Sequence, residues 1–326
     1  MKSRICLRNA MLIALLAGVL TGCGKKINKE QIAVDESRGI RFSDDRKIIE
    51  GYNPKLDEKE YTIPEGVSIV GDRAFEKCRN LTNVTIPNGV TSIGEHAFRS
   101  CARLVNIVIP SSVRTIGNYA FEECDHLTRV VIPDGVASIG ERAFLSCSRL
   151  VSIEIPSSVR TIGDYAFEDC RSLSSVAVPD GVTEIGKGCF RNCKKLTSVT
   201  IPAGLRAIAF QAFYNCESLT SIDIPASVKN IEDSAFEECE SLERVTIPDR
   251  VNSIGSRAFM KCKRLVSVTI PDGVTTIGSS AFEDCKNLVR VRIPKTIKSI
   301  GARAFHGCPC EKQVKNDYKH LYNYEK

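Results

Sequence analysis

The sequence predicts an α/β solenoid: a right-handed coil of eleven 23-residue repeats, with a parallel concave β-sheet on one side and short helical turns on the other. Three observations predict it. One unit recurs every 23 residues from residue 63 to residue 308 without insertion or deletion. A phenylalanine and a cysteine recur in phase with a proline, and each unit joins an alternating apolar pattern to a helical spacing. The proline column consists of Pro64, Pro87, Pro110, Pro133, Pro156, Pro179, Pro202, Pro225, Pro248, Pro271 and Pro294.

Each unit begins with a short strand. In the unit around residue 130, Val130 and Ile132 alternate with Arg129 and Val131, so one set of side chains points inward and the other outward. Pro133 follows and ends the strand because it has no N–H to give to a sheet. Equivalent strands of successive units therefore stack into one parallel sheet.

The rest of each unit returns the chain to the next strand. Val136 and Ile139 cross the bottom of the coil in extended form, and Gly140 turns the chain. Ile139, Ala143 and Cys147 then stand at i, i+4 and i+8, which predicts a short helical turn opposite the strand. No coil buries its apolar residues alone, so neighbouring coils must supply the rest of the core.

The solenoid over residues 63–308 needs a cover at each end. Over residues 39–62, two apolar segments flank Ser43-Asp44-Asp45-Arg46, which predicts a hairpin and an N-terminal cap. Over residues 309–326, Val314, Tyr318 and Leu321 stand at i, i+4 and i+7, which predicts an amphipathic capping helix. Residues 23–38 are polar without periodicity and are expected to be a lipidated tether.

Residues 1–22 are interpreted as a lipoprotein signal peptide. Three basic residues precede an apolar stretch, residues 10–20, which is too short to span a membrane. Leu20-Thr21-Gly22-Cys23 then resembles the bacterial lipobox, which implies that Cys23 is lipidated and holds the protein on a membrane without spanning it. An ordinary secretory peptide is the alternative. Gly24, in place of Asp, resembles the sequence of diderm lipoproteins that leave the inner membrane, and this resemblance implies the outer membrane or cell surface within the cell envelope.

The complete unit resembles the BspA-type, or treponemal-type, leucine-rich repeat. The resemblance covers residues 63–308 at the Pro, Ala-Phe, Cys, Leu and Ile-Gly positions. It implies a bacterial surface protein that binds other macromolecules, without naming a ligand. Four departures stand out: Cys189 replaces the Ala before Phe, Ala209 and Glu232 replace the turn glycine, and Arg250 replaces a Gly or Ser. The last three predict a local disturbance of the turn geometry around repeats seven to nine.

The cysteines are expected to be structural. The eleven repeat cysteines form one apolar column in which equivalent side chains point the same way, a poor geometry for disulfides. Two close pairs are exceptions that could form a disulfide or bind a metal: Cys189 with Cys193, and Cys308 with Cys310. Neither pair has a second half of metal-ligand spacing, so we expect no metal site and no cofactor.

Composition and motifs argue against two functional classes. The formal net charge is only +6, and three of the positive charges lie in the signal segment, so no basic stripe indicates nucleic acid. The four histidines lie in separate repeats or the cap, without spacing to a nucleophile or a metal set. We therefore predict no catalytic residues and a protein that is not an enzyme.

The concave face of the strands is the candidate binding surface, since extended sheets of solenoids serve this purpose. Its middle is small and hydroxylated, and its C-terminal end is basic. The partner is expected to be a protein or an anionic glycan at the cell surface, and the membrane is contacted through Cys23. The alternative is a structural envelope lipoprotein that associates with itself or with a neighbour. The candidate contact residues are Arg129, Glu154, Asp223, Arg244, Arg290 and Arg292.

Overall fold

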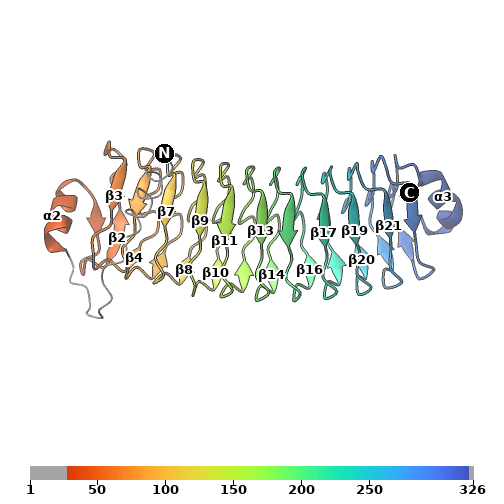
Figure 1. Cartoon of the computed structure of the whole chain (residues 1–326), viewed down its shortest axis with the longest axis horizontal. Helices are drawn as coiled ribbons and strands as arrows, with labels where there is room; N and C mark the ends of the chain where they lie inside the picture. Colours follow the sequence, from red (N-terminus) through yellow and green to blue (C-terminus); the bar gives the residue numbers. More distant parts are fainter. Residues whose placement is uncertain (1–27, 323–326) are drawn as a thin grey trace, which may run out of the picture.

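A computed structural model describes residues 28–322, which form one elongated solenoid (Figure 1). Each coil contributes a three-residue strand and, on another side, a two-residue strand. The three-residue strands are β3 (Glu60–Thr62), β5 (Asn83–Thr85), β7 (Asn106–Val108), β9 (Arg129–Val131), β11 (Ser152–Glu154), β13 (Ser175–Ala177), β15 (Ser198–Thr200), β17 (Ser221–Asp223), β19 (Arg244–Thr246), β21 (Ser267–Thr269) and β23 (Arg290–Arg292). The two-residue strands are β4 (Ile69–Val70), β6 (Ser92–Ile93), β8 (Thr115–Ile116), β10 (Ser138–Ile139), β12 (Thr161–Ile162), β14 (Glu184–Ile185), β16 (Ala207–Ile208), β18 (Asn230–Ile231), β20 (Ser253–Ile254), β22 (Thr276–Ile277) and β24 (Ser299–Ile300).

Both sets of strands pair in parallel with a register of one repeat, so that Ser152 lies beside Arg129 and Ile162 beside Ile139. The three-residue strands form a five-stranded group, β3 to β11, and the separate pairs β13–β15, β17–β19 and β21–β23. The two-residue strands form one sheet that ends at β14 and another from β16 to β24. The predicted solenoid is therefore confirmed, with a second sheet that the sequence did not indicate.

The third side of each coil is a stack of turns, and the short helices expected there are absent from the repeats that the structure describes. In one coil, Tyr119 and Glu123 adopt positive φ angles of 57° and 59°, which no α-helix contains. The Phe121 N–H donates to the Ala143 carbonyl of the next coil at 2.8 Å, while Cys124 N–H donates back to Phe121 at 3.2 Å. Hydrogen bonds between coils thus replace those of a helix.

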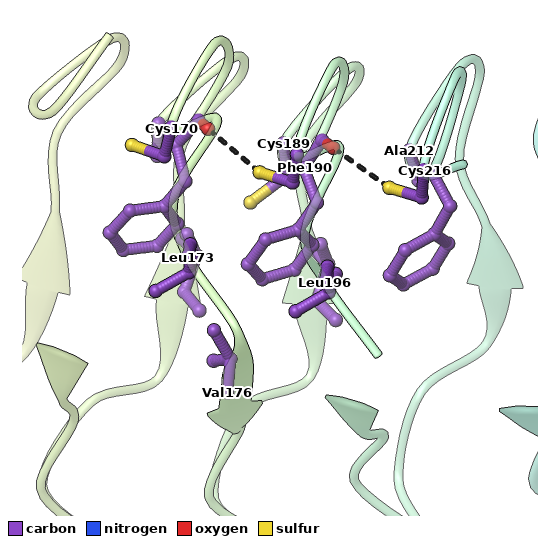
Figure 2. Close-up of a cluster of buried hydrophobic side chains, with 14 of the residues drawn as sticks. Cys170, Leu173, Val176, Cys189, Phe190, Leu196, Ala212 and Cys216 are labelled. Atoms are coloured by element: carbon purple, nitrogen blue, oxygen red, sulfur yellow. Dashed lines mark hydrogen bonds between the residues drawn. The ribbon is translucent and has the colours of Figure 1, made fainter. Parts of the chain in front are cut away.

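A column of phenylalanine rings fills the core. Adjacent rings are stacked, with centroids 5.6 Å apart between Phe167 and Phe190 and 5.5 Å between Phe190 and Phe213. Each repeat thiol after the first donates to the phenylalanine carbonyl of the preceding coil, as Cys216 Sγ does to Phe190 at 3.1 Å (Figure 2). That carbonyl also accepts the Cys193 N–H at 3.2 Å. Cysteine suits this column because it packs as a small apolar side chain and still carries a donor for the second lone pair of the carbonyl.

All thirteen cysteines of residues 28–322 are buried free thiols, including Cys189, Cys193, Cys308 and Cys310. Burial raises the pKa of the Cys239 thiol to about 12, so the reactive thiolate is scarce at neutral pH. We predict that a thiol reagent at pH 8 labels few of these cysteines in the native protein and all of them after denaturation without reductant. Counting labels by mass spectrometry tests this. Denatured protein that stays largely unlabelled would show that the column forms disulfides.

The expected disturbance around Ala209 is present. At the regular glycine position, Gly186 N–H donates to the Ile162 carbonyl at 2.9 Å, and Lys187 N–H donates to Asp164 Oδ1 at 2.8 Å. Among the described residues, no such backbone bond is made by Ala209, and the sheet of two-residue strands is interrupted between β14 and β16.

The second departure, Glu232, compensates for part of this loss. The side chain in the preceding coil at the position that should accept the Phe210 N–H is Lys187, which has no acceptor. Phe210 N–H donates instead to Glu232 Oε2 of the following coil at 2.8 Å. The two departures from the repeat therefore belong to one local rearrangement.

The N-terminal cap contains the expected hairpin and one unexpected helix. β1 (Arg41–Phe42) pairs antiparallel with β2 (Ile48–Gly51), which continues the sheet of two-residue strands through β4. The segment 23–38 was expected to be a tether, but its residues Lys29–Ser37 form helix α2. This helix is held by the solenoid, since Ile32 is fully buried and the Tyr61 hydroxyl donates to Asp35 at 2.7 Å.

The C-terminal end is covered by α3 (Glu311–Tyr318) and the short 3-10 helix η1 (Lys319–Leu321). Val314 is buried, and the Tyr318 hydroxyl donates to the Ile293 carbonyl at 3.0 Å, so the predicted amphipathic helix is present. Among residues 28–322, no helix is long and apolar enough to cross a membrane. The predicted signal peptide and Cys23 lie outside the described residues.

Candidate binding surface on the strand face

The strand face comprises the outward-pointing first and third residues of the three-residue strands. Most of these strands alternate exposed, buried and exposed residues, because the central side chain enters the core. Successive strands lie side by side along the solenoid (Figure 1), and their register of one repeat places equivalent residues in two columns. All six contact residues predicted from the sequence are exposed on this face: Arg129, Glu154, Asp223, Arg244, Arg290 and Arg292.

Near its N-terminal end the strand face carries an apolar pair that the sequence analysis did not single out. Val108 is 71% exposed and Val131 is 46% exposed. They occupy the same position in the neighbouring strands β7 and β9, which pair through Asn106 and Arg129. Single exposed apolar residues are ordinary, so two adjacent valines do not define an interface.

Arg129 and Glu154 neutralise each other. They extend from the neighbouring strands β9 and β11, and Arg129 Nη2 forms an ion pair with Glu154 Oε1. Both side chains remain more than half exposed, so the pair contributes little to stability. Sequence analysis placed both residues on the correct face but could not show that they bind one another.

The arginines at the C-terminal end differ from Arg129 in having no partner. Among the described residues, none offers a hydrogen bond or an ion pair to the side chains of Arg244, Arg290 or Arg292. Arg244 lies on β19, and the other two lie on β23. Their guanidinium donors are therefore available to a ligand.

A groove of about 660 Å³ opens between these strands. It follows the line where β19 and β21 are not joined in one hydrogen-bonded sheet. Arg244 and Arg292 belong to its lining, as do the aspartates Asp249 and Asp272. The remaining lining residues are Val245, Thr246, Ile247, Ser267, Thr269, Pro271 and Gly273.

The structure thus brings together only part of the predicted set. Arg244 and Arg292 line the groove, whereas Asp223, Arg129 and Glu154 do not. Asp249 and Asp272 were missed because each follows a repeat proline in a turn, a position that looks like ordinary loop solvation in the sequence. The proline-aspartate pair in two successive repeats was the signal that could have indicated them.

The residue types that commonly bind metals form no metal-binding cluster within residues 28–322. No group of three or more His, Cys, Asp or Glu residues in this range is arranged to hold a metal ion. His96 stacks on the Tyr119 ring with centroids 4.5 Å apart, and His126 Nδ1 lies 2.7 Å from the Ala102 carbonyl oxygen. These imidazoles belong to the packing of the turns.

Comparison with solved structures identifies bacterial leucine-rich-repeat proteins. A leucine-rich repeat protein from Bacteroides ovatus is 26% identical, with a TM-score of 0.55, over 95% of this chain and 100% of that one. A leucine rich cell surface protein from Faecalibacterium prausnitzii is also 26% identical, with a TM-score of 0.53, over 89% and 92% of the two chains. The pneumococcal vaccine antigen PcpA is 19% identical, with a TM-score of 0.52 and coverage of 78% and 80%, and shares the fold. No curated protein matches the chain.

The family comparison agrees with the repeat pattern. The family model described as the BspA type leucine rich repeat region matches six times, over residues 52–174 and 183–315. These matches cover most of the chain and fit a protein of the bacterial cell envelope. The protein belongs to the BspA-type leucine-rich-repeat family.

Proposed function

We propose that this protein is a surface-tethered binding scaffold whose strand face recognises a macromolecular partner, as an adhesin does. The main support for this proposal is a difference between the arginines of the strand face. Arg129 is neutralised by Glu154, whereas the three arginines at the C-terminal end have no partner among the described residues. Guanidinium groups bind carboxylates and other anions in a planar, bidentate manner. Membership in a family with bacterial surface proteins supports a binding role.

The test reverses the free charges on the full chain. The triple variant Arg244→Glu, Arg290→Glu and Arg292→Glu is expected to bind immobilised bacterial-surface or host-matrix material about 10–100-fold more weakly, in the range of arginine hot spots. It should also lose most of the salt dependence. The side chains point away from the core, so the circular dichroism spectrum and the melting temperature should stay unchanged.

A matched control carries the same charge change elsewhere. Lys187, Lys229 and Arg257 are exposed, lie outside the three-residue strands and have no side-chain partner among the described residues. Their replacement by Glu should leave binding intact. If both triple variants bind like the wild type, the strand face is not the site. If the only ligand recovered is the protein itself, the structural role in the envelope replaces the proposed one.

The tether is the second part of the proposal. Lipidation of Cys23 would attach the N-terminal end to a membrane and leave the C-terminal groove at the far end of the solenoid (Figure 1). Cys23→Ser is expected to move the protein from the membrane fraction to the soluble fraction, or to leave its precursor uncleaved. Metabolic labelling with a fatty acid measures this. Equal acyl labelling of the variant would place the lipid on another residue.

A further inference from the structure

We propose that the groove between β19, β21 and β23 binds a uronic-acid polysaccharide, a glycan whose sugars carry both a carboxylate and hydroxyl groups. The inference rests on the proposed function, because it assigns a ligand class to the same strand face. It is argued from three features of the groove: its free cations, its hydroxylated floor and its acidic edge.

The cationic side of the groove selects for carboxylates. Arg244 and Arg292 line it from strands two coils apart, and their guanidinium groups have no partner among residues 28–322. Arg290 continues the charge on β23, in the same column as Arg244. Neighbouring strands lie about 5 Å apart, so the arginines of β19 and β23, two coils apart, offer charges roughly 10 Å apart along the solenoid axis. A polymer with a carboxylate on each sugar can reach both.

The floor is built for hydroxyl groups. Thr246, Ser267 and Thr269 point outward from β19 and β21, and all three are exposed. Each hydroxyl can donate one hydrogen bond and accept others, so it can pair with the hydroxyls of a sugar. The groove of about 660 Å³ has the size of a ligand site, and it lies on a side of the strands that no other part of the described chain covers.

The acidic edge decides between a glycan and an acidic peptide. Asp249 and Asp272 are both exposed and belong to the same lining as Arg244 and Arg292. A carboxylate accepts hydrogen bonds only, so these two residues attract hydroxyl donors and repel further carboxylates. The carboxylates of an acidic peptide would pair with the arginines but would be repelled by the aspartates. A uronic-acid polymer also pairs with the arginines, and its hydroxyl groups can donate hydrogen bonds to the aspartates.

The lining predicts weak binding at each sugar and strong dependence on polymer length. No aromatic side chain is present among the lining residues, so the large contact area that anchors tight complexes is missing. Repeated contacts of a polymer raise the overall affinity through effective concentration. Short fragments should therefore bind much more weakly than long chains.

The experiment measures binding of the full chain to polygalacturonate, to its fully methyl-esterified form and to poly-L-glutamate at low salt. We expect polygalacturonate to bind at least tenfold more tightly than either comparison polymer. Arg244→Gln with Arg292→Gln should weaken that binding at least tenfold. The double variant Asp249→Asn with Asp272→Asn should bind polygalacturonate more weakly and poly-L-glutamate more tightly than the wild type. General charge attraction does not produce these opposite changes. Lys187→Gln with Arg257→Gln serves as the matched charge control and should change neither affinity.

Each other outcome overturns a defined part of the proposal. The proposal of a uronic-acid ligand is contradicted if the wild type does not bind polygalacturonate. It is also contradicted if the wild type binds poly-L-glutamate more tightly than polygalacturonate. If the aspartate variant binds both polymers more tightly than the wild type, the aspartates do not bind sugar hydroxyl groups. If the arginine variant binds polygalacturonate as tightly as the wild type, the groove is not the binding site. In all of these cases the strand face can still bind a protein partner. The proposed function itself fails if the charge-reversed triple variant retains that partner, or if the only ligand recovered is the protein itself.

Discussion

Replacing Phe190 with alanine is expected to lower the free energy of unfolding by about 3–5 kcal/mol, the cost of deleting a large buried ring. Phe190 is fully buried in the middle of the solenoid. It stacks on Phe167 and Phe213 at interplanar angles of 9° and 12°, so both aromatic contacts are lost together with the burial. Urea unfolding followed by circular dichroism measures the change.

The position of the deletion adds a second expectation. In a solenoid, stability is approximately the sum of terms for each coil and for each interface between neighbours. Weakening two central interfaces should separate the single unfolding transition into two, one for each side of residue 190. The control is Val108→Ala, because Val108 is 71% exposed and its truncation should cost under about 0.5 kcal/mol. Equal destabilisation by both variants would contradict the stacked core.

Gly186→Ala is the second substitution with a large expected effect, about 1–3 kcal/mol of destabilisation from overpacking. A Cβ atom added at Gly186 would lie 2.4 Å from the Asp164 nitrogen and 2.5 Å from the Gly163 carbonyl carbon. Both contacts are to backbone, which cannot rotate away. Relief requires the two coils to separate and to lose the Gly186 N–H bond to Ile162.

The natural departure at Ala209 supplies the matched comparison for this prediction. Here the coil already carries a methyl group, and the sheet of two-residue strands is already interrupted. Ala209→Gly removes a methyl group at the position equivalent to the one where Gly186→Ala adds it. It should change the free energy of unfolding by under about 1 kcal/mol, the scale of glycine's backbone entropy. Thermal unfolding of the two variants tests this. A stabilisation by Ala209→Gly as large as the destabilisation by Gly186→Ala would mean that the interruption of the sheet has not relieved the crowding around the Ala209 methyl group.

The repeat made most of the fold predictable from the sequence. A fixed register of 23 residues places every equivalent side chain in a column, so inward residues such as Val130 and outward residues such as Arg129 were assigned correctly. The helical turn was wrong because the spacing of Ile139, Ala143 and Cys147 fits either a helix or a stack of turns. Positive φ angles at residues such as Tyr119 decide between them, and apolar periodicity contains no information about φ.

The helix over Lys29–Ser37, within the segment expected to be a tether, was missed for a different reason. Helix α2 has few apolar residues, and its order depends on contacts far away in the sequence, such as the hydrogen bond from Tyr61 to Asp35. Asp35 is buried against the solenoid, and this burial raises the pKa of its carboxyl group. At the binding surface, the arginines could be placed on their face from the sequence, but their pairing could not. Whether an exposed arginine meets a carboxylate depends on rotamers in neighbouring coils.

The interruptions of the two sheets are staggered along the solenoid. Where the three-residue strands are not joined, as between β19 and β21, the two-residue strands β20 and β22 remain paired and act as a spine. Between β14 and β16 the arrangement is reversed, since β13 and β15 stay paired. At each of these interruptions, one of the two sheets therefore still joins the neighbouring coils. Between β19 and β21 the groove opens in one sheet, while the pairing of β20 with β22 keeps the same coils together on another side.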